Sequence, residues 1–393
     1  MQKWDYLPMK KSIAFLLLLV VLAGCSQAAL EPVSRLADWL EAADLYAEQT
    51  ADELYAAALG EDMLIIYSTT TRMMDVAASF ERQYPGLIVQ VVHLREPELY
   101  DTLVHNYETG SFLGDLIISA DGRGIMTGEL LDSLIAVKYV PFDIAGSIMP
   151  GNNEALLMFA GEASVICYNE LYYSEPPVSN WWELTEEKWR GMVYFASPTR
   201  SMTTLAALCM IIDNSDRMAQ AYEDLHGRPL DLPPGESAGR EFVRRLIAND
   251  AVIVNSSDEV AEIVGAPGSH SPYIGIVVSS KMRLRGIGYE FMFNYGMEPF
   301  VGVYTPISVM MAGGARNVNV AKLFIRWLLG EADGQGVGYQ PYLQSGAWSV
   351  RSDVSDDTGI RSGDLNLLHL DRAFLYENYE TFLAFWDEIL EGS

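Results

Sequence analysis

Short apolar runs alternate with segments of helical periodicity between residues 63 and 155. The runs are rich in Ile, Leu and Val, which predicts strands, and the segments between them space apolar residues as amphipathic helices do. The expected strands are 63–68, 87–94 and 113–120. The expected helices are 73–84, 96–107 and a segment that begins at Gly122. This alternation indicates βαβ units with a parallel sheet.

The same alternation begins again after residue 155. The expected strands of this second series are 156–169, 191–196, 251–255 and 273–278. Its expected helices are 202–213, 216–226, 237–248 and 257–264. The fold class is therefore α/β with two units, and in such sheets ligands bind beyond the carboxyl ends of the strands.

The N-terminus has the pattern of a secretory leader. Basic residues precede an apolar stretch over residues 12–22, which is shorter than the ~20 residues that a membrane-spanning helix needs. The stretch ends in Leu22-Ala23-Gly24-Cys25, which resembles the bacterial lipobox. An acylated Cys25 would hold the protein to the cell membrane by its lipid chains, such as palmitate, on the extracytoplasmic side. The alternative is an ordinary secreted protein with a chance cysteine near the cleavage site.

Composition narrows the choice of partners. The formal net charge of −27 argues against nucleic acid, since no basic face could offset phosphate repulsion. Half of the 393 residues are apolar and 20% are charged, which excludes disorder over most of the chain. After the leader only Cys167 and Cys209 remain, and their apolar surroundings favour buried free thiols over a disulfide.

Hydroxyl-bearing residues gather where three of the expected strands run into helices. The candidate ligand-binding residues at these junctions are Ser68, Thr69, Thr70, Ser119, Asp121, Ser197, Thr199, Arg200 and Ser201, with Arg72 close by. A helix N-terminus offers free N–H groups and a positive dipole end, so such junctions suit an anion or a carboxylate. The alternative for any one junction is simple N-capping.

Signs of catalysis and of metal binding are missing from the sequence. The five histidines are scattered, and the chain has no Gly-x-Ser-x-Gly elbow and no Walker loop. A nucleophilic cysteine would need an exposed thiolate and a nearby base. We therefore expect no enzyme, no catalytic residue, no cofactor and no metal site.

Four segments resemble the bacterial extracellular solute-binding proteins that serve ABC importers, in the branch with ferric-iron, polyamine and sugar-phosphate or phosphonate binders. They are residues 52–94, GDLIISAD at 114–121, residues 168–204 with their Trp-x-x-Leu and Ser-Pro-Thr motifs, and residues 307–335. The resemblance implies a two-lobed periplasmic-binding-protein type II fold with two hinge strands, near 156–167 and 300–311, that closes on its ligand. The implied division is a signal peptide at 1–24, a tether and helix at 25–58, a first lobe of 59–155 plus 300–335, and a second lobe of 156–299 plus 336–393 with C-terminal helices.

The resemblance also bears on the ligand. Iron-binding members carry adjacent tyrosines after the strand that matches residues 273–278, whereas this chain continues Val278-Ser279-Ser280-Lys281. That departure argues against the usual ferric site and adds Ser279 to the candidate residues. Polyamine binding would call on Asp121, Trp181 and Trp182, although the tryptophans suit packing beneath a turn. Hydroxyls with an arginine favour a phosphate ester, a phosphonate or a carboxylate.

We therefore expect a monomeric, lipid-anchored protein that captures a small, anionic solute between two lobes and delivers it to the permease of an ABC transporter. The alternative is a sensory or interaction lipoprotein that uses the same lobes to signal to a membrane partner.

Overall fold

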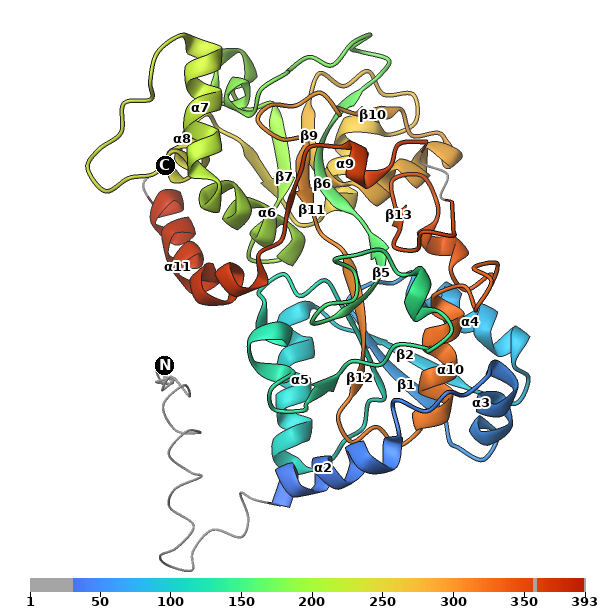
Figure 1. The fold of residues 1–393 in the computed structure, drawn as a ribbon. Coiled ribbons are helices and arrows are strands. Elements are labelled where there is room, and N and C mark those ends of the chain that lie inside the picture. The colour runs from blue at the N-terminus through green and yellow to red at the C-terminus, as the bar shows by residue number, and fades with distance from the viewer. Residues whose placement is uncertain (1–30, 356–358, 392–393) are drawn as a thin grey trace, which may run out of the picture.

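The computed structural model describes residues 31–355 and 359–391, which form two lobes, each built on a mixed sheet (Figure 1). The first sheet has the strand order β13-β5-β12-β3-β1-β2, with β4 paired to β12. Its strands are β1 (Leu64–Ser68), β2 (Val89–His93), β3 (Leu116–Ser119), β4 (Ala136–Val137), β5 (Leu157–Gly161), β12 (Ile307–Ala312) and β13 (Trp348–Ser349). Strand β1 is parallel to β2 and β3, while β12 is antiparallel to β3 and β5.

The second sheet has the order β14-β11-β6-β9-β7-β8, with β10 paired to β6. Its strands are β6 (Ala163–Asn169), β7 (Val193–Ala196), β8 (Val252–Val254), β9 (Ile274–Val278), β10 (Phe291–Phe293), β11 (Gly302–Tyr304) and β14 (Leu367–His369). Strand β7 is parallel to β8 and β9, and β6 is antiparallel to β9. The expected βαβ units are therefore present in both lobes, with antiparallel return strands added to each sheet.

Three passages of the chain join the lobes: two short hinge crossings, and a longer one between β13 of the first sheet and β14 of the second. Only Glu162 separates β5 of the first sheet from β6 of the second, and Thr305 and Pro306 separate β11 from β12. The two-lobed fold with two hinge strands is thus confirmed. The crossings also fix the direction of the other strands: Ser119 at the end of β3 pairs with β12 next to its hinge end. Val278 at the end of β9 likewise pairs with β6 beside its hinge end.

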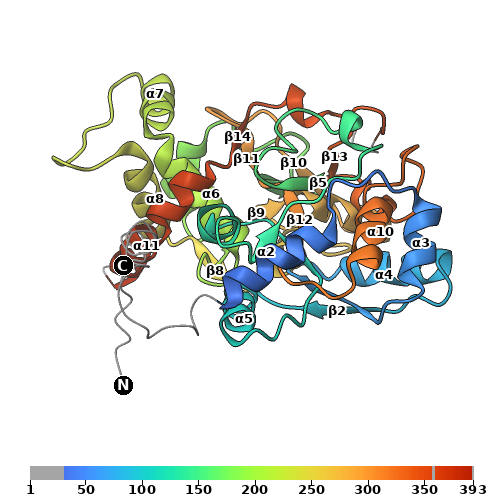
Figure 2. The ribbon, with the colours of Figure 1, turned by 60° about the horizontal axis from the view of Figure 1, so that its bottom comes forward.

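Helices cover both sheets (Figure 1; Figure 2). Those of the first lobe are α2 (Glu31–Ala43), α3 (Ala51–Ala58), α4 (Met73–Gln83), α5 (Glu96–Thr109), the π-helix η2 (Met126–Leu130) and α10 (Val318–Leu328), with short 3₁₀ turns η3 (Ala145–Ser147) and η7 (Gln340–Tyr342). Those of the second lobe are α6 (Met202–Asp213), α7 (Ser215–His226), α8 (Ala238–Ala248) and α9 (Ser257–Gly265), with 3₁₀ segments η4 (Trp181–Thr185), η5 (Glu187–Trp189), η6 (Ser279–Ile287) and η8 (Ser362–Asp364).

The segment 336–350 lies with the first lobe, although the sequence led us to expect it in the second. Its strand β13 pairs with β5, and Tyr339 and Tyr342 are buried in the core of the first lobe. The segment carries no clear periodicity, so only the long-range pairing with β5 places it. The predicted packing role of Trp181 and Trp182 agrees with the structure, since both are buried beside Phe242.

The last helix, α11 (Arg372–Glu391), contacts both lobes. Its later turns bury Phe382, Phe385 and Trp386 in the core of the second lobe, which agrees with the expectation that the C-terminal helices close over that lobe. Its first turns reach the first lobe instead: the Tyr376 hydroxyl donates to Glu129, and the Tyr376 ring lies against Gly128. Helix α11 therefore adds side-chain contacts between the lobes to the passages of the chain.

Both cysteines of the described residues, Cys167 and Cys209, are free and buried, as their apolar surroundings predict. Burial raises the pKa of each thiol to about 12, so neither is a ready nucleophile. Across residues 31–355 and 359–391, no helix combines the length and apolar character that a membrane span requires. The predicted signal peptide and Cys25 lie outside the described residues.

Candidate functional site

The two hinge crossings bring the predicted junctions of both lobes to the same boundary. In the first lobe, the carboxyl ends of β1 and β3 lie at the hinge end of the sheet, as the pairing of β3 with β12 shows. In the second lobe, the carboxyl ends of β7 and β9 lie at the hinge end, because β9 pairs with β6. This is the edge at which ligands of open α/β sheets bind.

The Ser68 junction is braced by its own hydroxyls. Ser68 is buried, and its Oγ accepts from the Thr70 N–H at 3.1 Å and donates to the Thr70 carbonyl at 2.9 Å. The Thr69 hydroxyl donates to the Ile118 carbonyl at 3.3 Å, which ties this junction to β3. Thr70 is half-buried beside Tyr342. The Ser68 and Thr69 hydroxyls are therefore used within the junction itself.

The Ser119 junction is built around a buried carboxylate. The Ser119 hydroxyl accepts from the Asp121 N–H at 3.0 Å, and Asp121 adopts a left-handed backbone conformation with a φ of 54°. The Asp121 carboxylate accepts from the N–H groups of Met126 and Thr127 and from the Thr127 hydroxyl. It thus caps the π-helix η2 and shapes the loop that carries Gly122.

A second buried acid supports the same loop. Glu96 is 5% exposed, and its carboxylate accepts from the Gly122 N–H at 2.7 Å and from the Tyr100 hydroxyl. Burial raises the pKa of Glu96 to about 7, and the nearby charge of Asp121 also raises it. The position of Gly122 is therefore coupled to a carboxyl group that titrates near neutrality.

The Ser197 junction of the second lobe is the most exposed of the three. The hydroxyls of Ser197 and Thr199 are 2.8 Å apart, and Ser201 caps α6 by accepting from the Thr204 N–H at 3.3 Å. Arg200 is exposed and hydrogen-bonds to the Asn255 side chain. The Ser197 and Thr199 hydroxyls are bonded to each other, and their exposure leaves them accessible to a solute.

Ser279 lies at the hinge and is fully buried. Its hydroxyl accepts from the Ala163 N–H at 2.9 Å, at the start of β6, and donates to the Gly346 carbonyl. A Cβ at Gly346 would lie 1.8 Å from the Ser279 carbonyl oxygen, so this close approach requires glycine. Ser279 therefore joins the second lobe to the segment that packs on the first.

Two contacts across the boundary place the junctions of one lobe against those of the other. A Cβ on Gly122, after β3, would lie 2.8 Å from the Met202 carbonyl oxygen at the start of α6. Arg72, after β1, lies 3.5 Å from the Ser280 hydroxyl, after β9. The structure thus brings the Ser119 junction close to the Ser197 junction, and the Ser68 junction close to Ser279.

Three basic residues surround the second of these contacts: Arg72, Lys281 and Arg283, of which Arg283 was not among the residues singled out from the sequence. Arg72 forms an ion pair with Glu162 at the hinge, and its guanidinium lies 4.6 Å from the centre of the Tyr342 ring. Lys281 and Arg283 follow on η6, and burial together with the charge of Arg283 lowers the pKa of both Arg72 and Lys281. The sequence pattern that could have indicated this cluster is the pair Lys281 and Arg283 shortly after the expected strand 273–278, in a strongly acidic chain.

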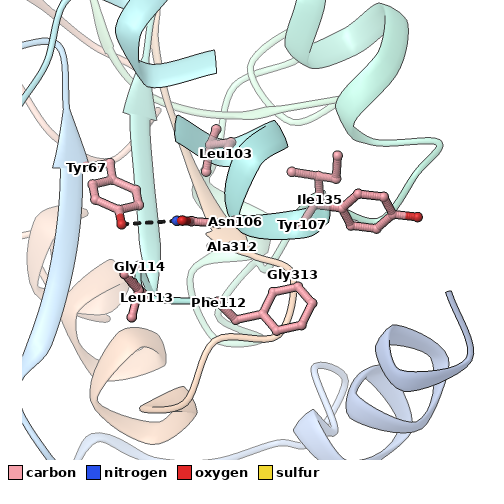
Figure 3. Close-up of a pocket in the computed structure, with 10 residues that line it drawn as sticks. All are labelled: Tyr67, Leu103, Asn106, Tyr107, Phe112, Leu113, Gly114, Ile135, Ala312 and Gly313. Atoms are coloured by element: carbon pink, nitrogen blue, oxygen red, sulfur yellow. Dashed lines mark hydrogen bonds between the residues drawn. The ribbon is translucent and has the colours of Figure 1, made fainter. Parts of the chain in front are cut away.

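Two cavities lie in the first lobe or beside it, and the larger borders the Ser119 junction, since Thr127 and Arg372 in its wall both contact Asp121. Figure 3 shows the smaller one, of about 10 Å³, beneath the hydrogen bond from Asn106 to the Tyr67 hydroxyl; it has room for about one water. The larger, of about 440 Å³, lies between the first lobe and the link from β14 to α11, with Met158, His369 and Arg372 in its wall. In the part of the chain that the structure describes, no three His, Cys, Asp or Glu side chains are grouped to hold a metal ion.

Comparison with known proteins agrees with this architecture. The chain is similar in structure to iron-bound HitA from Pseudomonas aeruginosa, with a TM-score of 0.63 and 15% identity over 84% of this chain and 99% of that chain. It is similar to apo ferric ion-binding protein A from Pasteurella haemolytica, with a TM-score of 0.60 and 16% identity over 84% and 98%. The substrate-binding protein of an ABC transporter from Agrobacterium tumefaciens gives a TM-score of 0.60 and 13% identity over 82% and 96%.

The fold is that of the type II periplasmic binding proteins. At 13–16% identity this similarity establishes the fold alone, so the fold that the sequence resemblance implies is confirmed. Residues 9–26 match a family model described as a prokaryotic membrane lipoprotein lipid attachment site. This range contains Cys25. No curated protein matches the chain significantly.

Proposed function

We propose that this protein is a lipid-anchored solute-binding protein that closes two lobes on a small anionic solute and delivers it to the permease of an ABC transporter. The observation that carries the proposal is the meeting of strand ends from both lobes at one hinged boundary. A solute held there touches both lobes, so binding favours the closed arrangement by its differential contacts.

The proposal includes a lipid anchor at Cys25 and delivery of the solute to a permease. The lipid attachment match over residues 9–26 supports acylation of Cys25 on the extracytoplasmic side. Structurally similar proteins include the substrate-binding protein of an ABC transporter. A permease that contacts both lobes would distinguish the closed, loaded form from the open one.

The candidate contacts are the half-buried Ser197 hydroxyl, the exposed Thr199 hydroxyl, the Ser201 and Thr70 side chains, and Arg200. The buried members, Ser68, Ser119, Asp121 and Ser279, would act by holding the junctions in place. Cations that line the boundary favour an anion over a polyamine, because Arg72 and Lys281 would repel a polycation.

A thermal-shift screen of the mature protein tests the proposal. The screen compares phosphates, sugar phosphates, phosphonates, carboxylates, polyamines and ferric iron, each over a range of concentrations. A true ligand raises the melting temperature progressively with its concentration. We expect a hit among the anions; a hit confined to polyamines or iron would overturn the anionic solute, and no hit in any class would count against solute binding itself.

A further inference from the structure

Three cations converge at the boundary between the lobes, beside the hinge. Arg72 comes from the first lobe, where it is the N-cap residue of α4, and Lys281 and Arg283 come from η6 of the second lobe. The Arg72 guanidinium reaches toward the Ser280 hydroxyl, and Arg283 donates to the Ser280 carbonyl at 2.7 Å. Ser280 therefore lies between an arginine of one lobe and an arginine of the other.

The negative charges near these cations balance them incompletely. Glu162 pairs with Arg72, and both side chains are largely buried. Lys281 pairs with Asp258, but the Asp258 side chain is 69% exposed, so water screens much of its charge. Within residues 31–355 and 359–391, Arg283 takes part in no ion pair with an acidic side chain. One positive charge in this group is left without a carboxylate, in a chain whose formal net charge is −27.

The pKa shifts of Arg72 and Lys281 agree with an excess of positive charge in this group. Burial lowers the pKa of Arg72 to about 10, and the charge of Arg283 lowers it as well. Burial also lowers the pKa of Lys281, and the charges of Arg283 and Arg72 lower it further. Like charges held together at a cost in free energy are relieved when an anion binds among them.

We propose that Arg72, Lys281 and Arg283 form the anion-binding centre of the solute site, and that they bind a tetrahedral oxyanion, such as the head group of a phosphate ester or a phosphonate. The inference rests on the proposed function and names its substrate class. Donors from three side chains suit a tetrahedral group, which presents three oxygens, better than a carboxylate, which presents two. Because the donors come from both lobes, the bound anion joins the lobes in the closed form.

This assignment differs from the one that the sequence suggests. Arg200 is exposed and bonded to Asn255. Arg283 instead donates to the carbonyl of Ser280, whose hydroxyl faces Arg72 of the other lobe. The two arginines carry the same charge on the same lobe. Arg200→Ala and Arg283→Ala therefore remove the same charge from the same lobe, and a difference in affinity between them shows which position the anion occupies.

Isothermal titration calorimetry on the mature protein tests the centre. The probes are inorganic phosphate, sulfate, glycerol 3-phosphate and glycerate, of which the last two differ mainly in a phosphoryl and a carboxylate group. We expect glycerol 3-phosphate or a free oxyanion to bind more tightly than glycerate. Replacement Arg283→Ala should weaken that binding about 10- to 100-fold, as for a lost charge-assisted hydrogen bond. Lys281→Ala should act in the same direction.

Two further variants make the result decisive. Arg190→Ala removes an exposed charge from the same lobe and should leave affinity unchanged. If Arg200→Ala weakens binding and Arg283→Ala does not, the centre is placed wrongly. If glycerate binds as tightly as glycerol 3-phosphate, the substrate class is wrong. If the thermal-shift screen finds only a polyamine or ferric iron, this inference fails while solute binding stands; if it finds no ligand at all, both fail.

Discussion

The Arg372 guanidinium lies 3.7 Å from the Asp121 carboxylate, measured from Nε to Oδ2, and so links the first turn of α11 to the loop after β3. Asp121 is completely buried, and its Oδ1 lies 3.0 Å from the Tyr100 hydroxyl, whose single proton is shared between Asp121 and Glu96. This carboxylate is thus the point where the C-terminal helix, α5 and the π-helix η2 meet.

Loss of the Asp121 carboxylate should destabilise the fold strongly. The change Asp121→Ala leaves the N–H groups of Met126 and Thr127 and the Arg372 guanidinium without their buried acceptor. We expect a loss of about 3–5 kcal/mol in the free energy of unfolding, measured by urea denaturation. Asp132→Ala is the control, because Asp132 is exposed in the same stretch of chain and should cost well under 1 kcal/mol. Equal losses in the two variants would contradict the role assigned to Asp121.

The stability of the protein should depend on pH through Glu96. The pKa of its carboxyl is raised from 4.5 to about 7 in the folded state, so the protonated acid is the form that the fold favours. Its contribution is complete below pH 4.5 and is lost as the pH rises to 7. Relative to Glu96→Gln, which cannot ionise, the natural protein should lose roughly 3 kcal/mol between pH 4.5 and pH 8. Parallel stability curves for the two proteins would show that Glu96 ionises normally.

A methyl group at Gly122 should oppose closure of the lobes. It would lie 2.8 Å from the Met202 carbonyl oxygen of the opposite lobe. We expect Gly122→Ala to weaken solute binding about 5- to 100-fold. Small-angle X-ray scattering should show a larger radius of gyration for this variant.

The matched control is Gly286→Ala, since a Cβ at Gly286 meets no atom within 4 Å. It should change neither the affinity nor the scattering curve. An unchanged radius of gyration in Gly122→Ala would mean that the contact with Met202 does not limit closure.

Replacement of Cys25 should release the protein from the membrane. The lipid attachment match covers this residue, so Cys25→Ser removes the thiol that we propose to be acylated. We expect the natural protein in the membrane fraction with incorporated palmitate, and the variant without label. Cys167→Ser serves as the control, because Cys167 is buried within β6 and should not carry lipid. Label retained in Cys25→Ser would place the modification elsewhere.

Much of the fold could be predicted because its elements carry strong local patterns. The helix expected over 202–213 is observed at Met202–Asp213, and the strand expected over 273–278 is observed at Ile274–Val278. The segment 336–350 could not be placed from sequence, since its position depends on pairing between β13 and β5. The contacts of α11 with the first lobe were likewise beyond local patterns.

The site was predictable in location more than in detail. Strand ends rich in hydroxyls indicated where the lobes meet, because parallel strands end at one edge of a sheet. The sequence did not show that the Ser68 and Ser119 hydroxyls accept from backbone N–H groups of their own turns. Serine commonly makes local hydrogen bonds of this kind. Nor did the sequence show that Arg72 meets Ser280, 208 residues away along the chain.

The attachment of α11 to both lobes limits how the molecule can move. The passages of the chain alone would allow a wide swing, but Arg372 and Tyr376 hold the first lobe while Phe382 and Trp386 hold the second. Opening must then either peel the first turns of α11 from the first lobe or stop at a narrow angle. Release of the solute would depend on the tail of the chain as well as on the hinge, and a shortened protein that lacks α11 should exchange its solute faster.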